Sequence, residues 1–119
     1  MQAKPNIILE KTFRFSLDTI AFVNQIEQER KFAIANQLLK SGTSIGANTR
    51  EAQSPESLKD FIHKMKIAMK EADENEYWLL LCEHSEFLPK PGKMLSDIKE
   101  IQKLLNSIIT SSNRKLNGF

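Results

Sequence analysis

Apolar residues recur along this chain at alternating steps of three and four positions, the spacing of one face of an α-helix. Strict alternation of apolar and polar residues, which indicates a strand, is absent over any useful length. The most regular run is a heptad seam, which predicts a long helix packed on its partners at a shallow angle. Its members are Leu58, Phe61, Met65, Ala68, Ala72, Asn75, Leu79 and Cys82.

The ends of this helix are marked by residue type. Ser54 is a suitable N-cap and Pro55 suits the first helical position, because proline lacks the amide hydrogen that would be unpaired there. Pro89 cannot continue a helix, so we expect this one to end near Phe87. The predicted helix covers residues 55–87.

Two further helices are predicted at residues 8–28 and 93–113. The later one has an apolar stripe made of Met94, Ile98, Ile101, Leu105 and Ile108. The earlier one has a row at helical spacing, with a second apolar set beside it. The row is Phe13, Leu17, Ile20 and Asn24, and the second set is Phe15, Phe22 and Ile26.

The segment 32–53 is harder to interpret, because residues 41–49 have the composition of a loop. The three-four step nevertheless continues through Gly42, Ile45 and Thr49. We therefore predict one continuous helix in which Gly42 and Gly46 allow a neighbouring backbone to approach closely. Each glycine costs roughly 1 kcal/mol of intrinsic helix stability, which close packing must offset.

Four helices of about 20 residues joined by short connections predict an all-α fold, an antiparallel up-down-up-down four-helix bundle. The length of 119 residues fits a single domain, here residues 1–119. With one cysteine, Cys82, the chain has neither an internal disulfide nor a cysteine-based zinc site. There is no signal peptide and no apolar run near 18 residues, so we expect a cytoplasmic protein that does not span a membrane.

The sequence gives little support for a catalytic, metal or cofactor site. The stretch from Gly42 to Gly46 lacks the lysine and spacing of a phosphate-binding loop. A di-iron bundle needs two Glu-x-x-His pairs, and only the stretch from Asp60 to His63 comes near that pattern. We find no convergent acid, base and nucleophile, so we expect no enzyme activity, no metal and no cofactor.

Charge is distributed unevenly along the helix predicted at 55–87. Lys59, His63, Lys66 and Lys70 follow one another at steps of four, three and four, which places them in one basic stripe. The second half of the helix is acidic, and this order opposes the helix dipole. Three interpretations remain open: an ordinary solvated face, pairing with a neighbouring subunit, or contact with nucleic-acid phosphates.

Tyr77 and Trp78 are adjacent, so they point about 100° apart on a helix and cannot both enter the apolar seam. At least one of them belongs at the edge of the core or at an interface between subunits. The sequence does not separate packing at the core edge from contact with another subunit.

Two stretches of the chain, residues 37–48 and 60–79, closely resemble the four-helix-bundle proteins known as 23S rRNA intervening-sequence proteins, and Glu10 to Phe13 is similar to that family's opening. The resemblance implies a small bacterial cytoplasmic protein without enzyme activity. It extends to accessory proteins of diversity-generating retroelements, which form pentameric barrels and bind nucleic acid and a reverse transcriptase. The resemblance therefore implies a pentamer.

From these observations we predict a non-enzymatic, oligomeric interaction protein that binds RNA or another nucleic acid through Lys59, His63, Lys66 and Lys70. The alternative is a purely structural homo-oligomer, or a scaffold for a partner protein, with no nucleic-acid partner. Tyr77 and Trp78 are the candidate subunit contacts. An enzyme is the least supported class.

Overall fold

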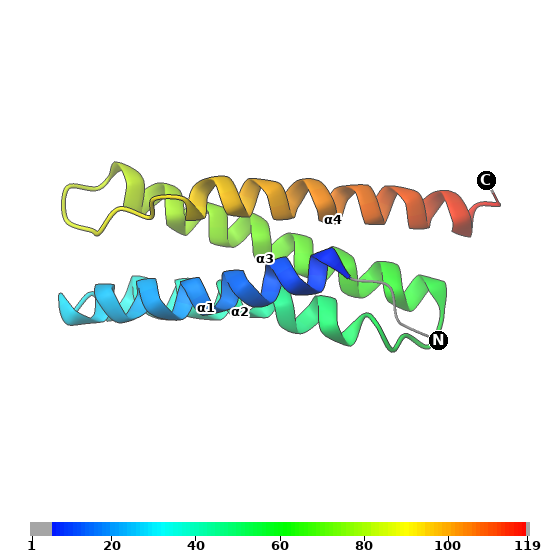
Figure 1. Cartoon of the computed structure of the whole chain (residues 1–119), viewed down its shortest axis with the longest axis horizontal. Coiled ribbons are helices and arrows are strands. Elements are labelled where there is room, and N and C mark those ends of the chain that lie inside the picture. The colour runs from blue at the N-terminus through cyan, green and yellow to red at the C-terminus, as the bar shows by residue number, and fades with distance from the viewer. Residues whose placement is uncertain (1–5, 119) are drawn as a thin grey trace.

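The computed structural model describes residues 6–118 of the chain, and the regular elements within them are four helices. They are α1 (Ile7–Gln28), α2 (Phe32–Glu51), α3 (Leu58–His84) and α4 (Met94–Leu116). Successive helices run in opposite directions and lie side by side over most of their length (Figure 1). The predicted antiparallel four-helix bundle is confirmed.

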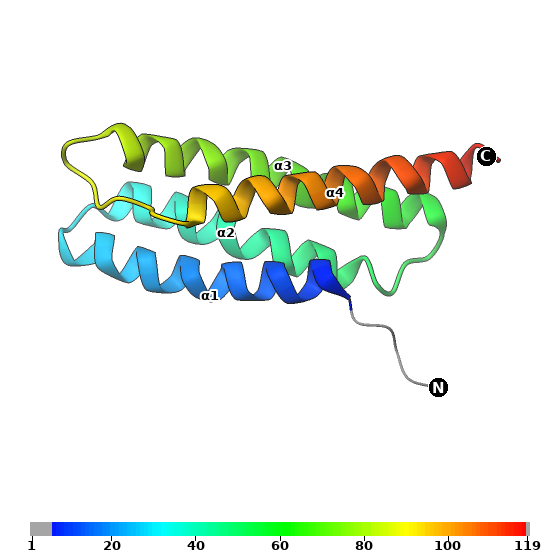
Figure 2. The same ribbon diagram turned by 45° about the horizontal axis from the view of Figure 1, so that its top comes forward.

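The four helices occupy the corners of a rod with extents of 50 × 28 × 21 Å. Helix α1 contacts α2 and α4, and α3 contacts the same two helices. It follows that α1 and α3 lie at opposite corners of the bundle, as do α2 and α4. Figure 2 shows α3 along one side of the rod and α1 along the other. This diagonal arrangement determines which surfaces face in opposite directions.

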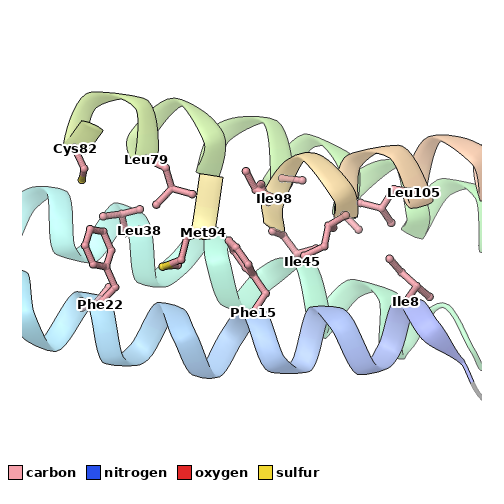
Figure 3. Close-up of a cluster of buried hydrophobic side chains, with 14 of the residues drawn as sticks. Ile8, Phe15, Phe22, Leu38, Ile45, Leu79, Cys82, Met94, Ile98 and Leu105 are labelled. Carbon is pink, nitrogen blue, oxygen red and sulfur yellow. The ribbon is translucent and has the colours of Figure 1, made fainter. Parts of the chain in front are cut away.

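The core is one cluster of apolar side chains to which all four helices contribute (Figure 3). Phe15 and Phe22 of α1 meet Leu38 and Ile45 of α2 in this cluster, and α3 contributes Leu79. The heptad seam predicted for α3 is buried from Met65 to Cys82, and at the start of the helix Ile62 is buried whereas Leu58 and Phe61 are only half-buried. Burial of one stripe from each helix is what makes the bundle stable.

Helix α2 runs without interruption through its two glycines, as the three-four step predicts. A Cβ atom on Gly42 would lie 2.5 Å from Oγ1 of Thr19 on α1. A Cβ atom on Gly46 would lie 3.2 Å from the carbonyl oxygen of Thr12. The side-chain hydroxyls of Thr12 and Thr49 are 3.1 Å apart across the same interface. The helices α1 and α2 therefore approach closely over a surface of small side chains.

Of the two apolar sets on α1, one is buried in the core and the other is exposed to solvent. Phe15, Phe22 and Ile26 are buried, whereas the row at Phe13, Leu17 and Ile20 is exposed, with Phe13 58% accessible. Both sets keep a helical step, so spacing alone does not identify the inner one. The polar Thr12 and Thr19 face α2 and are completely buried. The inner stripe is therefore partly polar, and a row with three large apolar residues lies outside.

The predicted start of α3 is wrong by three residues. Ser57, rather than Ser54, is the N-cap, and its Oγ accepts the amide hydrogen of Asp60 at 3.0 Å. The Asp60 carboxylate in turn accepts the amide hydrogen of Glu56. This pair of side-chain bonds satisfies amides that the first turn leaves free, so the helix begins after Pro55 instead of at it. At its other end the helix stops at His84, also three residues short of the prediction.

Candidate nucleic-acid interface

The basic stripe lies on the outer corner of the bundle. Lys59, His63, Lys66 and Lys70 are all exposed along the first half of α3. They lie on the opposite side of the helix from the buried Met65, Ala68 and Ala72, because at about 100° per residue the two sets are offset by roughly half a turn. The helix therefore holds four basic side chains in line at the surface, as their spacing predicts.

Within residues 6–118, none of these four side chains forms an ion pair. The nearby Lys64 is instead paired with Asp60 at 3.2 Å. The pKa of Asp60 lies below its ordinary value, because the carboxylate accepts the amide hydrogen of Glu56 and, second, contacts Lys64. The one acidic side chain in the first two turns of α3 is thus already engaged, and the stripe keeps its positive charge.

The stripe has a contribution from α4 that the sequence does not reveal. Lys59, His63 and Lys66 line a shallow depression together with Asn113 and Leu116 of α4. An asparagine amide can donate hydrogen bonds to phosphate oxygens, although these bonds are weaker than those of a charged lysine. Only the antiparallel pairing of α3 and α4 brings Asn113 beside the stripe, since it is 47 positions beyond Lys66 in the sequence.

The second half of α3 is acidic, and three of its carboxylates accept hydrogen bonds from side chains of this chain. Asp73 and Glu76 both accept hydrogen bonds from the side-chain amide of Gln102 on α4, at 3.0 and 3.3 Å. Glu74 accepts one from the indole N–H of Trp78 at 3.3 Å. This half of the helix would repel phosphate, so the part of α3 whose charge suits a polyanion is the stripe.

The adjacent aromatic residues divide between core edge and surface. Trp78 is half-buried and packs against the core, whereas Tyr77 is 56% exposed. Their rings meet edge to face with centroids 5.1 Å apart. Tyr77 is therefore a large apolar ring on the outer corner of α3, next to the acidic groups and beyond the end of the basic stripe.

Two other kinds of site were considered, a reactive cysteine and a metal site. Cys82 is buried, and burial raises the pKa of its thiol to about 11 despite the nearby Lys90, so it is a weak nucleophile. The described residues, 6–118, bring together no group of three or more histidine, cysteine or acidic side chains able to hold a metal ion. In the same part of the chain no helix is long and apolar enough to cross a membrane.

The surface also has apolar features that the sequence interpretation did not assign. The row at Phe13, Leu17 and Ile20 is one, and Leu80 and Leu81, beside Tyr77 on α3, are another. A monomeric protein carries scattered exposed apolar residues without consequence, but aligned ones mark a surface for association. The signal in the sequence was the presence of two apolar rows on α1, when one bundle buries only one.

The fold and surface together define a small four-helix-bundle protein with one basic corner and two exposed apolar rows. The chain belongs to the 23S rRNA-intervening sequence protein family, whose model matches residues 4–107. It is similar to a crystal structure from Bacteroides thetaiotaomicron, described as a protein of unknown function from the S23 ribosomal protein family. That likeness has 40% identity and a TM-score of 0.81, and covers 86% of this chain and 97% of the other. No curated protein matches the chain.

Proposed function

We propose that this protein is a non-enzymatic, self-associating cytoplasmic protein that binds the phosphate backbone of RNA or another nucleic acid. The observation that carries the proposal is the stripe of Lys59, His63, Lys66 and Lys70, which is exposed and has no ionic partner within residues 6–118. A polyanion would supply the missing negative charge and release its condensed counterions, which drives such binding.

The length of the stripe suits contact with a backbone. Lys59 and Lys70 are eleven residues apart on one helix, or about 16 Å at the usual rise per residue. One strand of a duplex carries about five phosphates over that length. Lysine binds phosphate as a point charge and does not read a base edge, so the proposed binding is largely independent of sequence.

The relatives are consistent with this proposal but do not establish it. The family's description refers to an intervening sequence of 23S rRNA, and the structural neighbour is assigned to a ribosomal protein family. The resemblance noted in the sequence adds a pentameric state and contact with nucleic acid. For this chain, both remain part of the proposal.

The test is a binding titration with a structured RNA at two salt concentrations that differ fourfold. If three lysines contact phosphates of a duplex segment of this RNA, the wild-type affinity should fall roughly 40-fold between the two concentrations. The variant with Lys59→Glu, Lys66→Glu and Lys70→Glu should lose measurable binding at the higher salt. Circular dichroism should show the helix content unchanged, because the three side chains are exposed.

A matched control separates a local contact from net charge. Lys31 is exposed at the far end of the bundle, in the turn between α1 and α2. The single variants Lys31→Glu and Lys66→Glu change the net charge equally, but only Lys66→Glu should weaken binding. Equal losses for the two, or wild-type binding that does not respond to salt, would show that the stripe is not the site.

The second candidate function is that of a purely structural homo-oligomer, or a scaffold for a partner protein. The exposed row on α1 favours it, because three large apolar side chains in line cost solvation free energy unless they are covered. Self-association without any RNA binding would identify the scaffold. A mass measurement in solution combined with the titration above distinguishes the two functions.

A further inference from the structure

Two exposed apolar surfaces lie at opposite corners of this bundle. We call the first the α1 row, which is Phe13, Leu17 and Ile20, and the second the α3 patch, which is Tyr77, Leu80 and Leu81. Each surface has three large side chains with more than a third of their area accessible. Since α1 and α3 are diagonal to each other, one molecule cannot cover either surface with the other.

The α1 row is bordered by a groove. Leu9 and Phe13 of α1 line it on one side, and Gly46, Ala47 and Arg50 of α2 line it on the other. Gly46 lines the groove, and its lack of a side chain lets α2 approach Thr12 of α1 closely. A helix packs on another by inserting its side chains into such grooves. The α1 row thus offers both apolar knobs and a groove to a neighbouring helix.

The α3 patch has the complementary properties. Tyr77 projects from the helix, and Asp73 and Glu74, one turn before it, are both exposed. The groove beside the α1 row has a cation at its rim, because Arg50 is exposed and forms no ion pair within residues 6–118. Arg50 at the rim of the groove is therefore complementary in charge to Asp73 and Glu74 beside the α3 patch.

We infer that the α1 row of one copy of this chain docks on the α3 patch of a second copy, with Arg50 facing the acidic border of that patch. The inference rests on the self-association proposed above and names the two surfaces that carry it. The contact is head-to-tail: each copy uses one surface for the copy before it and the opposite surface for the copy after it. The α3 patch begins two turns beyond Lys70, so the contact lies next to the basic stripe.

A head-to-tail contact can be distinguished from a symmetric contact by mixing two variants, each of which has lost a different surface. A copy that has lost its α1 row still has an α3 patch, and a copy that has lost its α3 patch still has an α1 row. The two defective copies can therefore join once, through the remaining intact pair of surfaces, but cannot extend further. Two copies joined by α1 row on α1 row would show no such rescue.

The experiment uses Leu17→Asp for the α1 row and Tyr77→Asp for the α3 patch, with the mass in solution measured by sedimentation equilibrium. We expect the wild type to exceed the 13.6 kDa of one chain and each variant to fall to that value. Mixed in equal amounts, the two variants should give a species of twice that mass and nothing larger. Both residues are more than half exposed, so circular dichroism should show that the variants fold.

Asn106→Asp is the matched control, because Asn106 is exposed on α4 and gains the same charge. It should associate like the wild type. If the wild type itself is monomeric, the proposed self-association fails. If the wild type associates while Leu17→Asp or Tyr77→Asp leaves the mass unchanged, or while the mixture stays at the mass of one chain, the head-to-tail contact is wrong and the self-association stands.

Discussion

Helices α2 and α4 occupy equivalent corners of the bundle and pack by different means. Each contacts both α1 and α3, and each buries six residues at helical spacing. In α2 these are Ala35, Leu38, Ser41, Gly42, Ile45 and Thr49. In α4 they are Met94, Ile98, Ile101, Leu105, Ile109 and Ser112. The same spacing thus supports a seam of small, partly polar residues and a seam of bulky apolar ones.

The small residues of α2 are matched by specific partners. Gly42 faces Thr19, Thr49 meets Thr12, and the hydroxyl of Ser41 accepts a hydrogen bond from the amide of Asn75 at 3.1 Å. Helix α4 relies on volume instead, since its buried Leu105 and three buried isoleucines fill the apolar core. The free energy of unfolding should therefore depend on the volume of the buried side chains at α4, and on how closely the helix packs on its neighbours at α2.

The largest expected effect is the removal of volume from α4. Leu105 is completely buried, so Leu105→Ala should lower the free energy of unfolding by about 3 kcal/mol through lost burial and the cavity left behind. Chemical denaturation measures the change. Leu116→Ala, at an exposed leucine of the same helix, should cost less than about 0.5 kcal/mol. Equal costs would contradict the view that α4 packs by volume.

At α2 the informative change adds volume. Gly42→Ala would place a methyl group 2.5 Å from Oγ1 of Thr19, which is held by its bond to the carbonyl of Phe15. We expect a net loss of about 1 to 2 kcal/mol, since overpacking exceeds the gain in helix propensity. The double variant with Thr19→Ala should recover part of it.

Gly46→Ala is the matched control for that prediction. Its methyl group would lie 3.2 Å from the carbonyl oxygen of Thr12, a tight contact that a small shift relieves. The gain in helix propensity should offset the strain, so the expected change in stability is near zero. If Gly42→Ala and Gly46→Ala were equally tolerated, close fit would not be what holds α2 in place.

The four helices differ in how well their buried faces could be predicted from the sequence. The seam of α3 and the continuity of α2 follow from spacing, because in each of these helices the stripe that keeps the helical period is the one that packing buries. The α1 row could not be distinguished from the inner stripe in this way. Phe13 is as apolar as Phe15, and only the neighbouring glycines of α2 favour the buried threonines over the exposed row.

Part of the candidate nucleic-acid interface could be predicted from the sequence, and part could not. The alignment of Lys59, His63, Lys66 and Lys70 is local and follows from the helix itself. The position of Asn113 beside the stripe and of Arg50 beside Phe13 depends on the packing of separate helices. No local sequence pattern predicts the position of either residue.

A partly buried carboxyl group on α3 allows a third test. One carboxylate oxygen of Glu71 is buried and has no hydrogen-bond partner within residues 6–118, and Oδ1 of Asn75, one turn on, is in the same state. Burial raises the pKa of Glu71 above its ordinary value, and nearby Glu74 adds to this while Lys40 opposes it. The folded state therefore holds the proton more tightly than the unfolded state.

The sign of the pH dependence follows from that shift. As the pH rises from the unfolded pKa through the folded one, the unfolded state loses its proton first, so stability should fall across that interval. Glu71→Gln should remove this component and raise stability at neutral pH by about 1 kcal/mol. Glu86→Gln, at an exposed loop residue, should leave the pH profile of unfolding unchanged. A profile that survives Glu71→Gln would show that another group is responsible.

The smallest expected effect concerns the entry into α2. Arg30 has a φ of 61°, the left-handed conformation that favours glycine, in the turn that closes α1. Its amide donates to the carbonyl of Glu27 at 2.9 Å, and the amide of Lys31 donates to that of Ile26 at 3.4 Å, a helix end at which glycine is the usual residue.

Replacing this arginine should therefore stabilise the protein. Arg30→Gly should add about 0.5 to 1 kcal/mol to the free energy of unfolding, because the Cβ atom that strains the turn is removed. Arg30→Ala removes the same charge but keeps the Cβ atom, so it should give no such gain. If the two variants were equally stabilised in thermal unfolding, relief of charge repulsion rather than of backbone strain would be the cause, and the turn would place no constraint on how α2 begins.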